Sequence, residues 1–370
     1  MFNPTLPNNN LSRLPNEEFN FNDIDLLKQL NKTNIAITEL NWVAKSIPNQ
    51  NILLEFISIK EWIKSNEIEA IHTTVWDAFM SELIDDKSKL SIENKETINY
   101  KESLYFWFNK IIKNWWLGFN DILEINRIIT ESNSWIISSP NKKIEKKDKS
   151  WKVEIVYTPP QWKNLIKDLL YNLEEYYNNY NEDDEIDPLL KLPLIHYQFE
   201  AIHPFGDWNG RTWRIIMVLY FVLYKKLDLP IIYLSDYINE YKNEYYQYLR
   251  DIDKWEKEAL KYFTLWLLKW IQIQALKTQI TIVKIRNLKD SLKEKFKKDL
   301  ELKKIYSKEL LDFIFIRPFY SISKTEEKLW IHRNTSSSYL NLLETKWIFE
   351  SKKFWKNKIF YYKDFFEILK

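Results

Sequence analysis

The chain has 370 residues, of which 45% are hydrophobic, and it contains no cysteine. This length is enough for two or three domains with apolar cores, and the lack of cysteine excludes disulfides and thiolate metal sites. The formal net charge of +2 argues against a general polyanion binder.

The sequence gives no sign of a membrane segment. The N-terminal stretch MFNPTLPNNN is polar, unlike a secretory signal peptide. The most apolar helical stretch, TLWLLKWIQIQAL, is interrupted by Lys269 and is too short to span a bilayer. We therefore expect a soluble cytoplasmic protein without a membrane partner.

The first third of the chain has helical periodicity. Residues 1–21 hold three prolines among polar residues and are expected to form an extended arm. Apolar residues then recur at helical spacing, which predicts helices over 23–46, 52–64, 97–112 and 120–130. The polar, lysine-rich residues 131–150 are expected to be a loop.

The middle of the chain begins with a strand. The stretch WKVEIVYTPP alternates, with Val153, Ile155 and Tyr157 on one face, which is typical of a strand. Helices are predicted over 162–180 and 188–201. The acidic NEDDEID between them lacks the spacing and the glycine of a calcium loop, so we interpret it as solvated.

The C-terminal third changes character along its length. Helices are predicted over 209–227 and 234–249, followed by an increasingly charged helical connector over 255–304. The last 65 residues predict three helices and a β-wing, with TSSSYLNLLE as the recognition helix, capped by Thr335. Residues 301–370 hold 14 Lys and Arg against 9 Asp and Glu, a local net charge of +5.

The stretch HPFGDWNGRTWR, residues 203–214, precedes and opens one of these helices. A polar loop that enters an apolar helix presents free backbone N–H groups, which favour an anion. The stretch holds one candidate base, His203, and one carboxylate for a metal, Asp207. Arg211 and Arg214 add guanidiniums, whose forks match phosphate oxygens.

This stretch resembles the signature of the Fic family, HPFx(D/N)GNGRxxR, and departs from it only where Trp208 replaces the first glycine of GNG. The resemblance covers about residues 5–270. It implies a mainly α fold: a Fic-type helical bundle with a short β-hairpin, the flap, that holds a target's backbone by strand addition. A small winged helix-turn-helix domain is a frequent C-terminal companion of Fic domains. The implied divisions are a regulatory region (1–95), a Fic catalytic domain (96–265), a helical connector (266–305) and a winged-helix-like domain (306–370).

The resemblance also implies an activity. Most Fic proteins transfer AMP from ATP to a hydroxyl of a target protein, which indicates a Mg²⁺-dependent protein adenylyltransferase acting on a target or on itself. His203 would take the proton of the attacking hydroxyl, and Asp207 would hold Mg²⁺. The arginines would neutralise the departing pyrophosphate. The residues implied in ATP binding are Trp208, Asn209, Gly210, Arg211, Thr212, Trp213 and Arg214.

An inhibitory segment is implied upstream of the signature. Ser65 and Glu69 match the family's motif (S/T)xxxE(G/N), although Ala70 stands where glycine or asparagine is expected. In the family this glutamate pairs with the second arginine of the signature, Arg214 here, and blocks the position of the γ-phosphate. We therefore expect autoinhibition by Glu69; the alternative is an ordinary solvated glutamate.

Other functions stay open. One is removal of AMP or transfer of another nucleotide, with Glu69 positioning a water. Another is a DNA-binding regulator whose Fic core is no longer catalytically active. Trp208 favours this alternative, because its indole would occupy the space where phosphate oxygens approach the backbone. The C-terminal domain is expected to bind DNA. The alternative is a protein-interaction domain, since Ser336–Ser338 give little basic charge for phosphates. The target and the oligomeric state stay open, with a homodimer among the alternatives.

Glycine is rare in this chain and tryptophan is common. There are 3 glycines and 17 tryptophans, whereas ordinary usage predicts roughly 26 glycines. Trp208, Trp213, Trp347 and Trp355 stand in a phosphate loop, after a helix or in a hairpin turn, where the backbone favours glycine. We infer that many of these codons are UGA, read as glycine in the source organism. The alternative is a genuinely tryptophan-rich protein.

Overall fold

The structure is a computed structural model. It describes residues 3–15, 19–68, 74, 92–131, 142–147, 153–179, 186–254, 258–354 and 357–369. The chain packs into two compact units. Unit 1 consists of Met1–Thr38, Glu102–Pro230 and Leu234–Gln274, and unit 2 consists of Glu39–Lys101, Ile231–Tyr233 and Ala275–Lys370.

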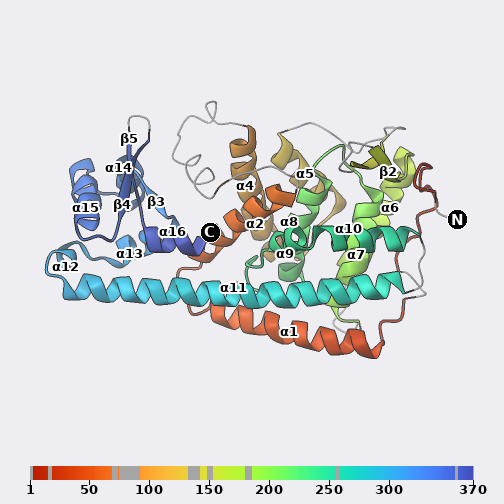
Figure 1. The fold of residues 1–370 in the computed structure, drawn as a ribbon, viewed down its shortest axis with the longest axis horizontal. Coiled ribbons are helices and arrows are strands. Elements are labelled where there is room, and N and C mark those ends of the chain that lie inside the picture. Colours follow the sequence, from red (N-terminus) through yellow and green to blue (C-terminus); the bar gives the residue numbers. More distant parts are fainter. Residues whose placement is uncertain are drawn as a thin grey trace. The chain divides into compact units, whose positions relative to one another are not determined.

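Unit 1 is a helical bundle (Figure 1). It contains the end of α4 (Ile92–Asn114), then α5 (Phe119–Thr130), α6 (Lys163–Asn178), α7 (Pro188–Ile202), α8 (Asn209–Leu223), α9 (Ser235–Glu240) and α10 (Lys242–Asp253). α7 packs against α6 and α8, and α5 packs against the same two helices. Both α7 and α8 are apolar around most of their circumference and almost fully buried, so they form the centre of the bundle. The helix predicted over 234–249 is split at Tyr241 into α9 and α10.

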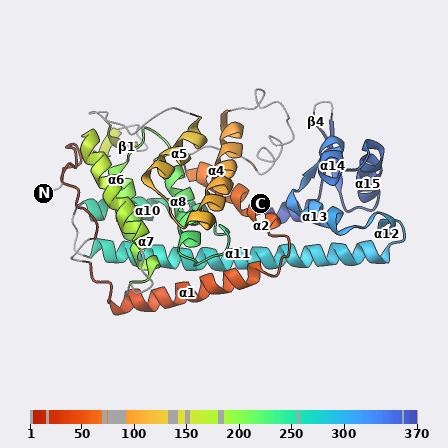
Figure 2. The same cartoon turned by 180° about the vertical axis from the view of Figure 1, so that it is seen from behind.

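A short hairpin accompanies the bundle. β1 (Ile144–Lys147) pairs antiparallel with β2 (Val153–Tyr157), and both views place the hairpin beside α6 (Figures 1 and 2). The strand prediction for β2 is confirmed. β1 corrects the loop predicted over 131–150, because its sequence IEKK is too short and too lysine-rich to display a strand pattern. We call β1 and β2 the flap.

The N-terminal arm is held on the bundle by polar contacts. The Leu14 N–H donates to the Asn172 side chain on α6 (2.8 Å), and the Gln198 side chain on α7 donates to the Ser12 carbonyl (2.8 Å). The Asn8 N–H donates to the Thr158 carbonyl (2.9 Å), directly after β2. The arm therefore ties together α6, α7 and the end of the flap.

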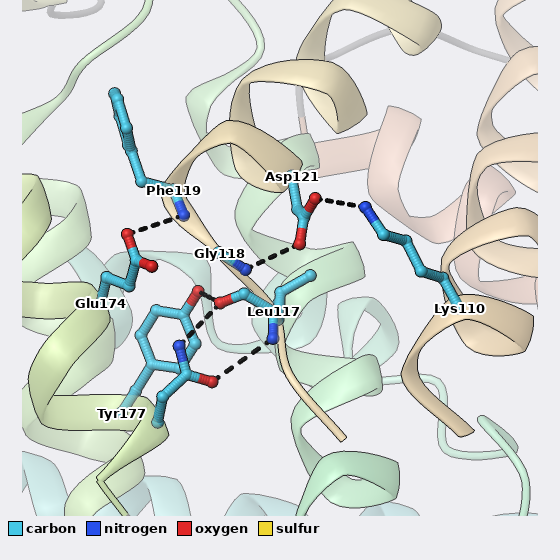
Figure 3. Close-up of polar contacts among 8 residues, drawn as sticks. Lys110, Leu117, Gly118, Phe119, Asp121, Glu174 and Tyr177 are labelled. Carbon is cyan, nitrogen blue, oxygen red and sulfur yellow. Dashed lines mark hydrogen bonds and ion pairs between the residues drawn. The ribbon is translucent and has the colours of Figure 1, made fainter. Parts of the chain in front are cut away.

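The turn between α4 and α5 is fixed by a cluster of polar contacts (Figure 3). The Gly118 N–H donates to one oxygen of Asp121 (2.7 Å), and Lys110 pairs with the other (2.6 Å). The Phe119 N–H donates to Glu174 on α6 (2.9 Å). Two carboxylates near the start of α5 thus satisfy N–H groups that a helix leaves open, which sets where α5 begins.

Two long helices contribute residues to both units. α1 (Ile24–Ala44) and α11 (Ala259–Lys298) are joined within unit 1, where the Thr33 hydroxyl donates to the Leu268 carbonyl (2.9 Å). The charged connector predicted over 255–304 is largely this one 40-residue helix α11. No helix in the described ranges is long and apolar enough to cross a membrane.

Unit 2 combines α2 (Asn51–Ile68) with the C-terminal elements. These are α12 (Leu302–Ile305), α13 (Lys308–Ile316), β3 (Phe319–Tyr320), α14 (Ile322–Leu329), α15 (Arg333–Thr345), β4 (Glu350–Phe354), β5 (Asn357–Tyr361) and α16 (Lys363–Leu369). The strands form an antiparallel sheet in the order β3-β5-β4, and α14 packs against α15 (Figure 1). The predicted three helices and wing are present; β3 and α16 were not predicted.

The cap predicted for the helix that begins near Thr335 is wrong. α15 begins at Arg333, and the His332 side chain caps it by accepting the Asn334 N–H (3.2 Å). Thr335 lies inside the helix instead. Histidine is an unusual N-cap, whereas threonine is a common one, so the sequence favoured Thr335 as the cap. The fold-class prediction, a mainly helical protein with a small strand pair and a small C-terminal domain, is confirmed.

The backbone conformation singles out four tryptophans. Among the described residues, eight non-glycine residues have positive φ, and half of them are tryptophan: Trp115 (49°), Trp208 (69°), Trp330 (54°) and Trp347 (57°). Trp115 and Trp330 directly follow a helix, and Trp347 follows the C-cap residue Lys346 of α15; glycine in this left-handed conformation is common at such helix ends. The geometry supports the glycine interpretation for these four positions. Trp355 lies outside the described residues.

Candidate active site

The signature forms a tight turn between α7 and α8. α7 ends at Ile202, and His203 takes the left-handed conformation (φ 47°), with its N–H bonded to the Phe199 carbonyl (3.0 Å). The Asn209 side chain closes the turn by accepting the Phe205 N–H (2.9 Å) and donating to the Phe205 carbonyl (2.7 Å). The Phe205 ring is buried in the core. The turn is therefore shaped by its own residues before any ligand binds.

A residue that sequence reasoning missed holds this turn from the side. Asn126 on α5 donates to the Thr212 hydroxyl (3.0 Å) and lies 3.5 Å from the Asp207 carbonyl. Thr212, predicted to bind ATP, therefore uses its hydroxyl within the protein. A signal for Asn126 was present: it lies on the buried face of α5, among isoleucines, where a polar side chain needs a partner.

The environment of His203 favours its neutral form. Burial lowers the pKa of the half-buried imidazole most, the nearby Lys142 ammonium lowers it further, and the Glu200 carbonyl opposes both, giving a pKa of about 3. A neutral imidazole can accept a proton at neutral pH. His196, by contrast, is fully buried and contacts the Tyr245 hydroxyl (2.9 Å), which agrees with a structural role.

Asp207 fits a role in holding a divalent cation. It is exposed on the turn, and its Oδ1 accepts the Trp208 N–H (2.8 Å). No group of three metal-ligating side chains occurs in the described part of the chain. Mg²⁺ is commonly held by one or two carboxylates together with substrate phosphates and waters, so a single aspartate beside a phosphate site suits it.

The start of α8 carries the arginines. Arg211 and Arg214 are both almost fully buried on this helix. Trp208 is the N-terminal cap residue, and the Arg211 guanidinium carbon lies 2.9 Å from the centre of its indole ring. The ring thus covers a group expected to meet phosphate oxygens. Asn209 and Gly210 form the first turn behind it.

Trp213 has a different position from the one expected. Its ring is buried in the core, stacked on Phe199 with centroids 4.9 Å apart and edge-on to His196 at 5.5 Å. Trp213 was expected among the phosphate-binding residues. Its ring instead lies on the face of α8 that packs against Phe199 and His196 of α7, which corrects that expectation.

The proposed inhibitory residue cannot be placed against this site. Glu69 and Ala70 lie outside the described residues. Ser65 is fully buried near the end of α2, in unit 2. Tyr241, between α9 and α10, packs its ring on Tyr237 with centroids 4.3 Å apart.

Comparison with known families agrees with this geometry. Residues 116–221 match the Fic/DOC family, and residues 27–108 match the Fic/DOC family N-terminal region. Residues 288–365 match the C-terminal domain of the protein adenylyltransferases described as SoFic-like. The chain belongs to the Fic/DOC family. The Fic match spans the polar cluster at Gly118, the flap and the signature turn, and ends within α8.

Two solved structures share the Fic fold with this chain. A Fic family protein from Desulfovibrio desulfuricans G20 aligns with a TM-score of 0.54 and 16% identity, over 92% of this chain and 96% of that one. A Fic domain containing signaling protein from Bacteroides thetaiotaomicron VPI-5482 aligns with a TM-score of 0.50 and 18% identity, over 66% of this chain and 95% of that one. At these identities the likeness concerns the fold.

Proposed function

We propose that this Fic protein is a protein adenylyltransferase that moves AMP from Mg²⁺-bound ATP to a hydroxyl of a target protein or of itself. The hydroxyl oxygen forms a bond with the α-phosphorus, the bond from that phosphorus to the bridging oxygen breaks, and pyrophosphate leaves. His203 takes the hydroxyl proton. Asp207 would hold Mg²⁺, which would neutralise phosphate charge, and Arg211 and Arg214 face the departing pyrophosphate.

The observation that carries this proposal is the placement of His203 in the signature turn. Its neutral imidazole follows α7 directly, and the carboxylate and the arginines follow within the same turn and the next helix. The phosphates of bound ATP would oppose the shift that Lys142 and burial impose on the pKa of His203. That would bring the base nearer to the pH at which it must work.

The test is incubation of the protein with Mg²⁺ and ATP labelled in either the α- or the γ-phosphate. Adenylyl transfer leaves the α-label on protein and releases the γ-label with pyrophosphate. Label from the γ-phosphate on protein would instead indicate phosphorylation. Absence of both labels, on this chain and on proteins of a cell extract, would contradict the proposal.

We further propose that Glu69 restrains the enzyme. Glu69→Gly is expected to raise basal self-modification by about 5- to 150-fold, the range typical of coupling between two sites, because a glutamate paired with Arg214 would exclude the γ-phosphate. The measurement is the initial rate of α-label incorporation at saturating ATP.

Glu67→Gly is the matched control, since Glu67 lies on α2, two residues before Glu69, and the change likewise replaces a glutamate by glycine. Equal rates in the two variants would argue against inhibition. A lower rate in Glu69→Gly would favour a glutamate that positions water for AMP removal.

A second function is favoured by one observation, the contact of the Trp208 ring with Arg211. If the ring stays there, the core is expected to bind ATP poorly, and the protein would act through its C-terminal domain as a regulator. Calorimetric titration with Mg²⁺-ATP separates the two functions, because an adenylyltransferase must bind ATP whatever its target is.

We propose that the C-terminal domain binds duplex DNA weakly. Its local charge of +5 favours contact with phosphates. However, Lys346 pairs with Asp299 and Glu301, and Lys358 pairs with Glu344, which reduces the charge available. We therefore expect detectable binding at low salt that is lost at moderate salt.

Fluorescence anisotropy of the full chain with a labelled duplex measures this binding. The charge reversals Arg333→Glu and Lys353→Glu alter exposed residues of α15 and β4 and are expected to weaken it. Lys163→Glu on α6 has the same charge change in unit 1 and serves as control. If all three variants bind as the parent does, or none binds at low salt, the domain is a protein-interaction module.

A further inference from the structure

Lys142 connects the flap to the signature turn. It lies two residues before β1, and its Nζ donates to the Phe205 carbonyl (3.0 Å) and to the Gly206 carbonyl. Two successive carbonyls of one turn thus meet a single ammonium group. The side chain of Lys142 reaches from the hairpin, which is expected to hold the acceptor, to the turn, which carries the base.

The charges around Lys142 support this connection. Burial lowers the pKa of its half-buried ammonium, while the Asp207 carboxylate opposes that shift. The same ammonium acts on His203, whose pKa it helps to lower. Fixing a lysine ammonium costs side-chain conformational entropy. The charge-assisted hydrogen bonds of Lys142 to the two carbonyls offset that cost. Its neighbour Lys143 is exposed.

The flap has a second link to the turn at its other end. The Tyr157 hydroxyl, on the last residue of β2, donates to the Ala201 carbonyl (2.9 Å), two residues before His203. This tyrosine is buried, and the Asn8 side chain of the N-terminal arm donates to its oxygen (3.2 Å). The hairpin is therefore tied on both sides of His203: β2 through Tyr157 to α7, and β1 through Lys142 to the turn.

We propose that Lys142 is a positioning residue: its ammonium fastens β1 of the flap to the Phe205–Gly206 turn, so that an acceptor segment lying on the flap and the imidazole of His203 keep one fixed separation. The proposal rests on the proposed adenylyl transfer for its catalytic consequence. A near-attack geometry is sensitive to displacements of about 1 Å, so a loosened flap impairs acceptor use without touching the nucleotide.

The kinetic test compares Lys142→Met, Lys142→Arg and the control Lys143→Met in the full chain. The acceptor is the inactive His203→Asn chain, and the donor is Mg²⁺ with α-labelled ATP. Lys142→Met removes both charge-assisted hydrogen bonds and is expected to raise KM for the acceptor at least roughly tenfold, the effect of losing one of them, and to leave KM for ATP unchanged. Lys142→Arg, which keeps a cationic donor, should recover most of the loss. An equal rise in both KM values would overturn the proposal.

A second measurement is independent of activity. Hydrogen exchange of backbone amides in β2 and in residues 203–209 is compared among the same variants. Lys142→Met is expected to speed exchange in both segments together, whereas Lys143→Met should speed it in neither. If exchange in Lys142→Met is the same as in the parent, the proposed attachment of the flap to the turn through Lys142 is overturned, whatever the transfer rate is. If the parent protein transfers no label but exchange changes as expected, the tie stands and the proposed function fails.

Discussion

Replacement of His203 by asparagine is expected to lower adenylyl transfer by about a hundredfold to ten-thousandfold, the usual effect of losing a general base. The residue has positive φ, a conformation that asparagine tolerates better than alanine, so this change removes the base with little strain on the turn. ATP binding should change little, because the groups expected to meet the phosphates are Asp207 and residues of the next helix, not the imidazole. The measurements are α-label transfer and calorimetric ATP affinity.

Two further variants make this result specific. His203→Ala should lose transfer to the same degree but also lower the melting temperature, since alanine is strained at this φ. His332→Ala removes an exposed helix cap in unit 2 and should leave transfer unchanged. Transfer by His203→Asn at the rate of the parent would remove the imidazole from the reaction.

Trp208→Gly is expected to tighten Mg²⁺-ATP binding by roughly tenfold to a hundredfold and to raise transfer with it. The gain in binding comes from release of the Arg211 guanidinium from the indole. Relief of the left-handed backbone, which costs an ordinary residue about 1–2 kcal/mol with or without ATP, stabilises the fold instead. Position 208 is also the place where the backbone must approach phosphate closely, and glycine has no Cβ to prevent this.

The structure separates Trp208 from Trp213. Trp213→Gly is expected to cost stability instead, because it empties a core site between Phe199 and His196. The double variant should therefore combine tighter ATP binding with a lower melting temperature. These comparisons need proteins made with the standard genetic code. If the parent binds ATP as tightly as Trp208→Gly, the ring is no obstacle to ATP, and only the left-handed backbone still favours glycine at 208.

Mass spectrometry of the natural protein tests the codon interpretation directly. The expected result is a peptide with glycine at position 208. Tryptophan there would contradict reassigned codons, whatever the recombinant variants do. The left-handed residues Trp115, Trp330 and Trp347 provide three further positions in the same measurement.

Local patterns predicted most helices well. The helix expected over 23–46 is observed as Ile24–Ala44, and that over 188–201 as Pro188–Ile202. Apolar spacing is a strong signal for such long elements. β1 was missed because four residues with two lysines carry no alternation, and the break at Tyr241 was missed because its neighbours continue the helical pattern.

The site was predicted only as far as it is local in sequence. The signature brought His203, Asp207 and the arginines together because they lie within one turn and one helix. Asn126 and Lys142 reach the same turn from about eighty and sixty residues away. The sequence marks Asn126 as a polar residue on an apolar face, but it does not tell which partner that residue meets. Trp213 was misplaced because sequence neighbourhood does not tell which face of a helix a residue occupies.

The four left-handed tryptophans also bear on how firmly the protein holds its fold. Each such residue is strained by about 1–2 kcal/mol relative to an ordinary backbone, whereas glycine there loses about 0.5–1 kcal/mol through the greater freedom of its unfolded chain. The difference, accumulated over four sites, reaches a few kcal/mol, a sizeable share of the 5–15 kcal/mol that separates folded from unfolded domains. Trp330 and Trp347 also leave 94% and 93% of their surfaces exposed to solvent. A chain that carries tryptophan at these positions is thus expected to have low folding stability and exposed apolar surface. Both favour its loss by proteolysis and aggregation in a cell.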